Sequence, residues 1–380
     1  MRSHSLKKTL NTSKQSKIKV VYPSLPFSVD STGSVNRLMS ILASESQQFG
    51  RQVEYFSTAR PESDLLNQSR LDVGPASRFF SRIGRLSGFE KLERLGNELL
   101  FSPLRKFGNE TNIWVSSNLH VTEYLVKYFP AEKIVYWVHS LPAGRKENER
   151  FKKLMKLPLN LVTPSIAIYK EIWRLCQAPS IGVFHYHIPN FHSVEPPINS
   201  NCQIEVDLPN DRPVIFHGGG DGINKGKHLV ERALQVVGRK RPLCLVAIGN
   251  RPRREESDKV LRIELEKMAP ERLGLLISLS DICLMPSLWF ENAPLLLLEY
   301  RAANRKVVAS RSGGIEEYAD RERTWFVENP NNVDEWIEKI EDALQSEKPP
   351  QSDLQTQKII SKSEWIEKWE SLFQQIEARG

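Results

Sequence analysis

The sequence of 380 residues has few cysteines and no long apolar run. Its four cysteines are far apart and form no C-x-x-C pair, which argues against a zinc ribbon or a disulfide framework and favours buried thiols in a reducing compartment. No stretch approaches the roughly 20 uncharged apolar residues of a membrane-spanning helix. Residues 1–17 are basic and rich in serine but lack an apolar h-region, so we expect a disordered arm rather than a secretory signal. We therefore expect a cytoplasmic protein.

The composition is that of a globular protein, with 40 % hydrophobic and 26 % charged residues. The net charge of +7 favours anionic partners such as phosphates, nucleotides or lipid headgroups. Nucleic acid is not an expected partner, because the basic residues are scattered and no nucleic-acid-binding module is recognisable.

Short apolar strands alternate with helical segments in both halves of the chain. Continuous apolar runs of this kind suit strands that are buried on both faces of a parallel sheet. The first half has such runs at 18–24, 52–58, 112–117, 134–140, 159–165 and 182–190. The second half repeats the pattern in "PVIFHGGG", "PLCLVAIGN", "DICLMPS", "KVVASRS" and "TWFVEN". We predict an α/β protein with two Rossmann-like, doubly wound parallel-sheet domains that face a central cleft.

The polar, proline-containing region 193–212 predicts an interdomain linker. It divides a first domain at 18–192 from a second domain at 213–362. Ligands of such sheets bind beyond the carboxyl ends of the strands. The loops at these ends are therefore the candidate sites.

One such loop, "HGGGDGINKGKHLVERAL", follows a strand and opens a helix. Gly218, Gly219 and Gly220 let backbone amides approach an anion, and Lys225 and Lys227 supply positive charge. The loop matches neither the Walker nor the G-x-G-x-x-G pattern, so we interpret it as a diphosphate site. The alternative is a plain tight turn with solvated lysines.

A second loop, "SLWFENAPLLLLEYRAAN", places two carboxylates eight residues apart, at Glu291 and Glu299. We expect Pro294 in the first turn of the following helix and Asn292 as its cap. Eight residues of helix span roughly 12 Å, which suits two ends of one elongated ligand better than a glycosidase carboxyl pair. Carboxylates accept hydrogen bonds from vicinal hydroxyls, so sugar and ribose are natural ligands. The alternative is a helix with an exposed glutamate at each end.

This E-x7-E spacing, the later "KVVASRSGGIEEY" and the "NKGKHLVERAL" loop resemble the retaining nucleotide-sugar glycosyltransferases of glycosyltransferase family 4. The shorter segments "WVHS", "VTPS" and "HIPN" resemble the family's first-half motifs. The resemblance covers roughly residues 110–320. It implies the GT-B fold, with a C-terminal helix at about 363–380 packing back on the first domain.

The resemblance also implies roles for single residues. Glu291 would bind hydroxyls of the transferred sugar, Glu299 the nucleotide ribose, Lys225 the diphosphate, and His139 would face the donor sugar. Gly33 would approach the ligand closely from the first loop. The backbone of Asn292, Ala293 and Pro294 would line the donor sugar.

The family's second diphosphate cation is an arginine six residues before the lysine, and here that position is Gly219. Arg311, at a strand end, is a candidate substitute. No D-x-D triplet occurs, which argues against a metal-chelating design. We expect no metal and no cofactor, with Lys225, glycine amides and a helix N-terminus stabilising the leaving group.

These observations predict a retaining, metal-independent glycosyltransferase. Its acceptor would be a glycan or lipid-linked saccharide, as in cell-surface polysaccharide biosynthesis. The alternatives are a nucleotide-sugar epimerase or phosphorylase on the same fold, or an inactive glycan- or nucleotide-binding protein.

Two further segments each allow two interpretations. Residues 78–106 interleave arginines with apolar residues and could dock on an anionic membrane surface, such as the inner face of the plasma membrane, although packing on the first domain is the favoured interpretation. "FHYHIPNFH" contains an H-x-H pair, which we interpret as partly buried strand-end histidines rather than a zinc site.

Overall fold

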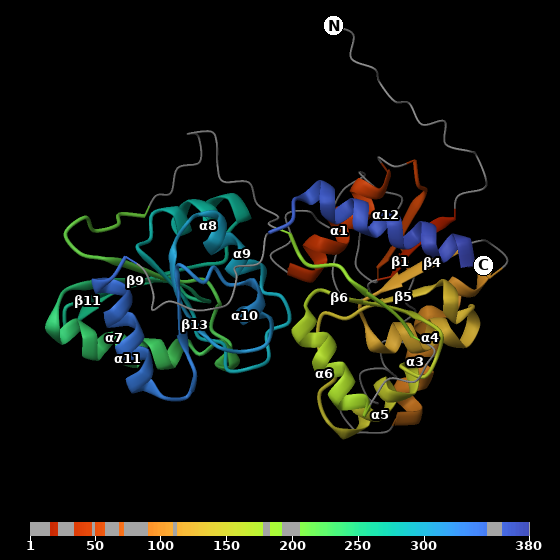
Figure 1. Cartoon of the computed structure of the whole chain (residues 1–380), viewed down its shortest axis with the longest axis horizontal. Helices are drawn as coiled ribbons and strands as arrows, with labels where there is room; N and C mark the ends of the chain where they lie inside the picture. Colours follow the sequence, from red (N-terminus) through yellow and green to blue (C-terminus); the bar gives the residue numbers. More distant parts are fainter. Residues whose placement is uncertain are drawn as a thin grey trace, which may run out of the picture.

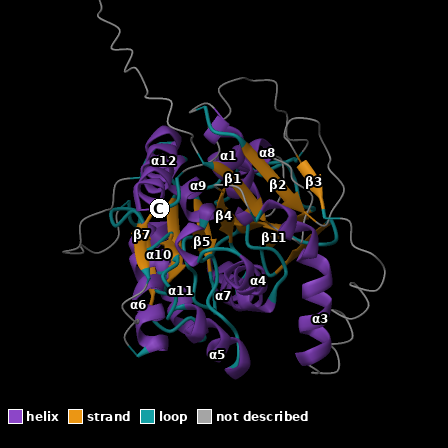
Figure 2. Ribbon diagram, turned by 90° about the vertical axis from the view of Figure 1, so that its right-hand side faces the viewer, coloured by secondary structure: helices purple, strands orange, loops and turns teal. Residues whose placement is uncertain are grey.

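The computed structural model describes residues 16–21, 34–47, 50–57, 68–71, 90–108, 112–177, 183–191, 206–347 and 359–379. These residues form two α/β domains that lie side by side, the second on the left and the first on the right of Figure 1. In the orthogonal view of Figure 2, the strands are enclosed between helices. The predicted α/β class and doubly wound architecture are confirmed.

The first domain is built on a seven-stranded sheet with the order β3-β2-β1-β4-β5-β6-β7, in which every neighbouring pair is parallel. The strands of this sheet are β1 (Lys17–Val21), β2 (Val53–Ser57), β3 (Gln68–Arg70), β4 (Asn112–Ser116), β5 (Ile134–Trp137), β6 (Asn160–Thr163) and β7 (Phe184–His187). Its helices are α1 (Ser34–Ser46), α3 (Glu90–Phe101), α4 (Leu119–Tyr128), α5 (Arg145–Leu154) and α6 (Ile166–Cys176), with short 3₁₀ turns η2 (Ser102–Phe107) and η3 (Ala131–Lys133).

The second domain repeats this plan with the order β10-β11-β9-β8-β12-β13-β14. Its strands are β8 (Val214–His217), β9 (Leu243–Ile248), β10 (Arg253–Ser257), β11 (Val260–Leu265), β12 (Ile282–Met285), β13 (Lys306–Ser310) and β14 (Thr324–Val327). Its helices are η4 (Ile223–Lys225), α7 (Lys227–Lys240), α8 (Pro270–Ser278), α9 (Leu295–Ala302), α10 (Gly314–Tyr318) and α11 (Val333–Gln345). Only β10 runs antiparallel to its neighbour among the strands described.

The central strands form because they are buried on both faces, as β4, β5, β8, β9 and β12 are along their whole length. Side chains at the strand ends then begin the helices. Asn118 accepts hydrogen bonds from the amides of His120 and Val121 at the start of α4, and Ser165 accepts one from Ile168 at the start of α6. β4 and β6 therefore each lead into a helix whose first turn is capped by a side chain.

The chain returns to the first domain in α12 (Lys362–Arg379), which lies beside α1 in Figure 1. Trp365 and Trp369 are buried against Trp137 of β5, with ring centroids 5.8 and 4.8 Å away. Arg51 bonds Glu370 at 2.6 Å and Glu377 at 2.7 Å. The last helix is therefore part of the first domain's core.

The first strand starts at Lys17, inside the predicted arm, and most of the predicted linker lies outside the described residues. The described part of the amphipathic stretch, α3 and η2, buries Phe101 and Leu104 in the first domain. None of the helices among the described residues has both the length and the apolar character needed to cross a membrane.

Candidate functional site

The glycine loop, residues 218–226, leads from β8 into α7 and lies against the loop that follows β12. Gly226 has a positive φ of 66°, and a Cβ there would come within 1.9 Å of the Pro286 carbonyl oxygen. The amide of Leu288 donates to the Asn224 carbonyl at 2.8 Å. Glycine at 226 is therefore required both by backbone conformation and by the close approach of the two loops.

The two loops meet at a carboxylate held by three donors. Oε1 of Glu291 accepts hydrogen bonds from Lys225 Nζ at 2.6 Å, Ser287 Oγ at 2.6 Å and Trp289 Nε1 at 2.7 Å. Within the part of the chain that the structure describes, Oε2 accepts none. The carboxylate is thus oriented by one oxygen and presents the other, which is the arrangement needed to accept a ligand hydroxyl.

Two cavities adjoin this cluster and share Gly219 and Lys225. The smaller, of about 260 Å³, is lined among others by Gly218, Glu291 and Pro294. The larger, of about 660 Å³, is lined by the rest of the glycine loop and by residues of other elements, namely Ile248, Gly249, Asn250, Lys267 and Trp289. The predicted residues Gly218, Gly219, Gly220, Lys225, Glu291 and Pro294 are therefore brought together around one site.

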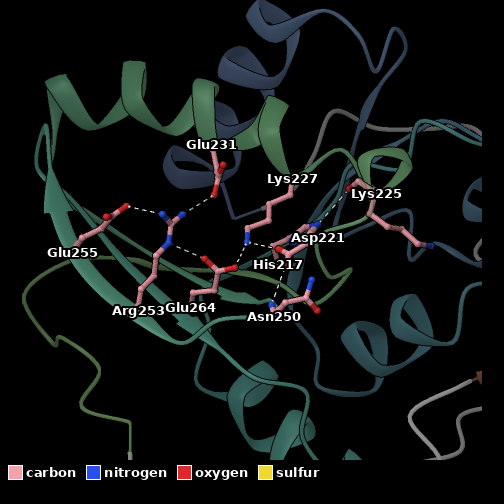
Figure 3. Close-up of polar contacts among 9 residues, drawn as sticks. All are labelled: His217, Asp221, Lys225, Lys227, Glu231, Asn250, Arg253, Glu255 and Glu264. Atoms are coloured by element: carbon pink, nitrogen blue, oxygen red, sulfur yellow. Dashed lines mark hydrogen bonds and ion pairs between the residues drawn. The ribbon is translucent and has the colours of Figure 1, made fainter.

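Lys227 belongs to a separate polar cluster, in which its side chain points toward Asp221 and Glu264 (Figure 3). Its ammonium bonds Asp221 at 2.7 Å and Glu264 at 2.6 Å, and Glu264 also accepts a bond from Arg253 at 2.8 Å. Burial acts to lower the pKa of Lys227, but its bonds to the two carboxylates outweigh this and raise the pKa above its usual value. Asp221 in turn accepts the amide of Asn250 at 2.7 Å. The cluster ties the glycine loop to β9 and β11.

Glu299 lies in the second turn of α9, where it is 7 % exposed. Its Oε1 accepts a hydrogen bond from Arg37 of α1 at 2.8 Å, so the contact joins the two domains. Burial raises the pKa of Glu299, and Arg37 opposes the rise. Neither cavity described above includes Glu299 in its lining, and its contact with the nucleotide ribose stays a prediction.

The segment from Asn292 to Pro294 also contacts the first domain. The Asn292 amide donates to the carbonyl oxygen of His139, and Asn190 donates to the Ala293 carbonyl at 3.0 Å. The predicted cap was wrong: α9 begins at Leu295, with Pro294 just before it in an extended conformation. Asn292 does not cap this helix because its side chain is bonded across the domain interface.

His139 follows β5, and its ring lies 4.3 Å from that of Trp137. Its Nε2 is buried without a hydrogen-bond partner among the described residues. Burial lowers the pKa of His139 to about 3, so the ring is neutral at pH 7. Neither cavity described above includes His139 in its lining, and its place near the donor sugar stays a prediction.

Two other predicted site residues, Arg311 and Gly33, are not among the described residues that line the two cavities. Arg311 bonds Glu316 at 2.6 Å and Glu328 at 2.7 Å, so its charge already has two carboxylate partners. Gly33 lies outside the described residues. Of the strand-end histidines, His185 stacks on Tyr169 and contacts Thr163, whereas His187 lies 3.5 Å from Glu317.

Sequence reasoning missed Ser287, Trp289, Arg37 and Asn190. Ser287 and Trp289 lie in the same loop as Glu291, and Asn190 ends the "HIPN" motif. These three residues could therefore have been found from the motifs that contain them. Arg37 could not have been found in this way, because it is 262 residues from Glu299.

Comparisons with known proteins agree with this architecture. Residues 212–346 match the family model described as Glycosyl transferases group 1. A search of curated proteins found no match.

Several solved structures are similar along almost the whole chain. Sucrose-phosphate synthase from Thermosynechococcus elongatus is 15 % identical with a TM-score of 0.66, covering 96 % of this chain and 98 % of that one. A trehalose-6-phosphate protein from E. coli bound with UDP-2-fluoro glucose is 14 % identical with a TM-score of 0.62, covering 96 % of each chain. The Anabaena HepE protein in complex with UDP and glucose is 13 % identical with a TM-score of 0.61, covering 87 % and 90 %. The chain therefore has the GT-B fold, and the match to the glycosyl transferases group 1 model lies in its second domain.

Proposed function

We propose that this protein transfers a sugar from a nucleotide-sugar donor to a saccharide acceptor. The observation that carries the proposal is the convergence of Lys225, Glu291 and the glycine loop around two adjoining cavities at the carboxyl ends of β8 and β12. Similar structures were obtained with UDP and glucose or with UDP-2-fluoro glucose bound, which supports a donor of the same class.

In the proposed reaction, the bond between the sugar's anomeric carbon and the diphosphate oxygen breaks, and the diphosphate leaves with the electron pair. The acceptor hydroxyl oxygen bonds to the anomeric carbon, and its proton passes to the departing phosphate. Glu291 holds the sugar through Oε2, while the Lys225 ammonium and the amides of the glycine loop meet the charge that develops on the diphosphate.

We propose a metal-independent reaction, because Lys225 and backbone amides are available for this charge and the sequence has no D-x-D triplet. Retention of anomeric configuration follows from the resemblance to family 4 and belongs to the same proposal. NMR of the product linkage would test it, since an inverted product contradicts retention.

The acceptor is proposed to be a glycan or lipid-linked saccharide of cell-surface polysaccharide assembly, and the protein is proposed to act in the cytoplasm, with peripheral binding to the inner face of the plasma membrane as a further hypothesis. Liposome flotation tests the membrane part. Binding should require anionic lipid and weaken with salt, because surface charges are screened within about 10 Å at 0.1 M. Equal binding to neutral vesicles at high salt contradicts an electrostatic dock.

The decisive experiment incubates the full chain with UDP-, GDP- and ADP-sugars and measures release of the nucleoside diphosphate, with and without a saccharide acceptor. Acceptor-stimulated release from one donor supports the proposal. Nucleotide binding without any release, detected as a raised melting temperature, would instead favour the inactive binding protein. Interconversion of the nucleotide sugar without release would favour an epimerase.

A further inference from the structure

Arg37 reaches from the first domain to a carboxylate of the second. It lies in the first turn of α1, and its Nη2 is 2.8 Å from Glu299 Oε1. The Arg37 side chain is 10 % exposed, so both charges of this pair are largely removed from water. A buried ion pair of this kind must keep its charges matched, because an unpaired buried charge is costly.

Two other cations of the second domain, Lys227 and Arg311, are already matched. Lys227 has Asp221 and Glu264, and Arg311 has Glu316 and Glu328. Lys225 has Glu291 alone, and position 219, where the resembling family places an arginine, is glycine. A diphosphate carries more negative charge than one ammonium balances, so a second cation would stabilise it further.

Arg37 has the capacity to act as that cation. A guanidinium carries five N–H donors in a planar fork, and the bond to Glu299 uses one of them. Its Nε is buried without a hydrogen-bond partner among the described residues. Arg37 can therefore hold Glu299 and a phosphate oxygen at the same time.

Resting on the proposed function, we propose that Arg37 is a donor-binding residue that the first domain contributes to the site. When a nucleoside diphosphate occupies the site, its ribose hydroxyls donate hydrogen bonds to the Glu299 carboxylate. The Arg37 guanidinium donates a hydrogen bond to a phosphate oxygen. The second positive charge on the diphosphate thus comes from the opposite domain rather than from position 219. The nucleotide would bridge the domains through the same two side chains that join them without it.

The test compares nucleoside diphosphates with nucleosides by isothermal titration calorimetry of the full chain. UDP, GDP and ADP are titrated beside uridine, guanosine and adenosine, into the wild type and Arg37→Gln. Losing a charge-assisted bond to phosphate should weaken diphosphate binding about 10- to 100-fold, with nucleoside binding changed less than about 3-fold. Equal weakening of diphosphate and nucleoside binding, or no change in either, would overturn the proposal. Tighter binding of both ligand classes would also overturn it, because it would show that Arg37 only competes with the ligand for Glu299.

A double variant separates a phosphate contact from an effect through Glu299. Arg37→Gln with Glu299→Gln leaves no unpaired buried charge, which keeps the test valid if Arg37→Gln alone folds poorly. Under the proposal the double variant binds the diphosphate more weakly than Glu299→Gln alone, and equal affinity overturns it. Lys362→Gln is the matched control, because Lys362 pairs with Glu45 at the other end of α1, 3.0 Å away. A wild type that binds none of the three diphosphates would instead overturn the proposed function itself.

Discussion

Lys225 and Lys227 stand two residues apart in one loop, yet they belong to two different environments. Lys225 is 30 % exposed, lines both cavities and has one carboxylate partner, Glu291, which is itself a candidate ligand-binding residue. Lys227 is 11 % exposed, lines neither of these two cavities and has two carboxylate partners, Asp221 and Glu264. In Figure 3 the Lys225 side chain extends away from the Lys227 cluster. The difference indicates that the Lys225 side of the loop faces the candidate site, whereas the Lys227 side holds the loop in place.

The largest effect should follow from Lys225→Ala. Breaking the sugar–phosphate bond adds negative charge to the diphosphate, and removing one preorganised stabiliser of developing charge typically lowers kcat about 10²- to 10³-fold. We expect a loss at or beyond that range in steady-state assays, with EDTA leaving the wild type unaffected. Activity abolished by EDTA and restored by manganese would refute the metal-free scheme.

Glu291→Gln should have the next largest effect, because it keeps the shape of the side chain and removes its charge. We expect kcat to fall roughly 10- to 100-fold and KM to rise by a smaller factor, because the sugar changes charge in the transition state. Ser287→Ala, which removes one of the three donors to Oε1, should act in the same direction more weakly. Full turnover in Glu291→Gln would mean that this loop is structural.

Lys227→Ala should lower stability rather than catalysis directly. The change leaves Asp221 and Glu264 without their shared ammonium. We expect a cost of about 2 kcal/mol, below the 3–5 kcal/mol of fully buried pairs because Asp221 is 31 % exposed. Differential scanning calorimetry should show a melting temperature lower by about 4–8 °C. Lys240→Ala, which removes an exposed pair with Glu341, is the control and should change little.

The two sides of the loop should also respond to acid in different pH ranges. Burial lowers the pKa of His217, which contacts the Lys225 carbonyl, to about 4. Between about pH 6.5 and 4 the unfolded state binds this proton and the folded state does not, so stability falls as pH falls. The bond with Lys227 lowers the pKa of Asp221, whose contribution is therefore present above its ordinary pKa and is lost only at lower pH.

His217→Gln tests this difference. Urea unfolding at pH 7 and pH 5 should show a smaller loss of stability in the variant than in the wild type, by up to about 2 kcal/mol. Equal losses in the two proteins would show that His217 is not buried in its neutral form.

Much of the fold was predictable because the buried strands are continuous apolar runs, as in "VIFH" and "LCLVAI". Strand β10 was missed because all five of its residues, "RREES", are exposed and polar, and β3 because it has three residues. The glycine loop and Glu291 were predictable from local patterns at strand ends.

The contacts between domains were not predictable in this way. Asn292 looked like a helix cap, and its bond to the His139 carbonyl depends on a residue 153 positions away. The Arg37–Glu299 pair likewise depends on two residues that are far apart in the sequence and lie in different domains. Local sequence patterns report the helix or strand that a residue belongs to, whereas these bonds depend on how two separately folded sheets meet.

The return of α12 to the first domain affects the order in which the protein can fold during synthesis. The face of the first sheet that carries Trp137 is covered by Trp365 and Trp369, which follow the entire second domain in the chain. At roughly 5–20 residues per second, a ribosome needs tens of seconds to translate the intervening segment. Throughout that interval the part of this face that α12 covers has no covering helix, although α1 packs beside it. We expect chaperones to associate with the nascent chain at this stage, before the second domain has emerged.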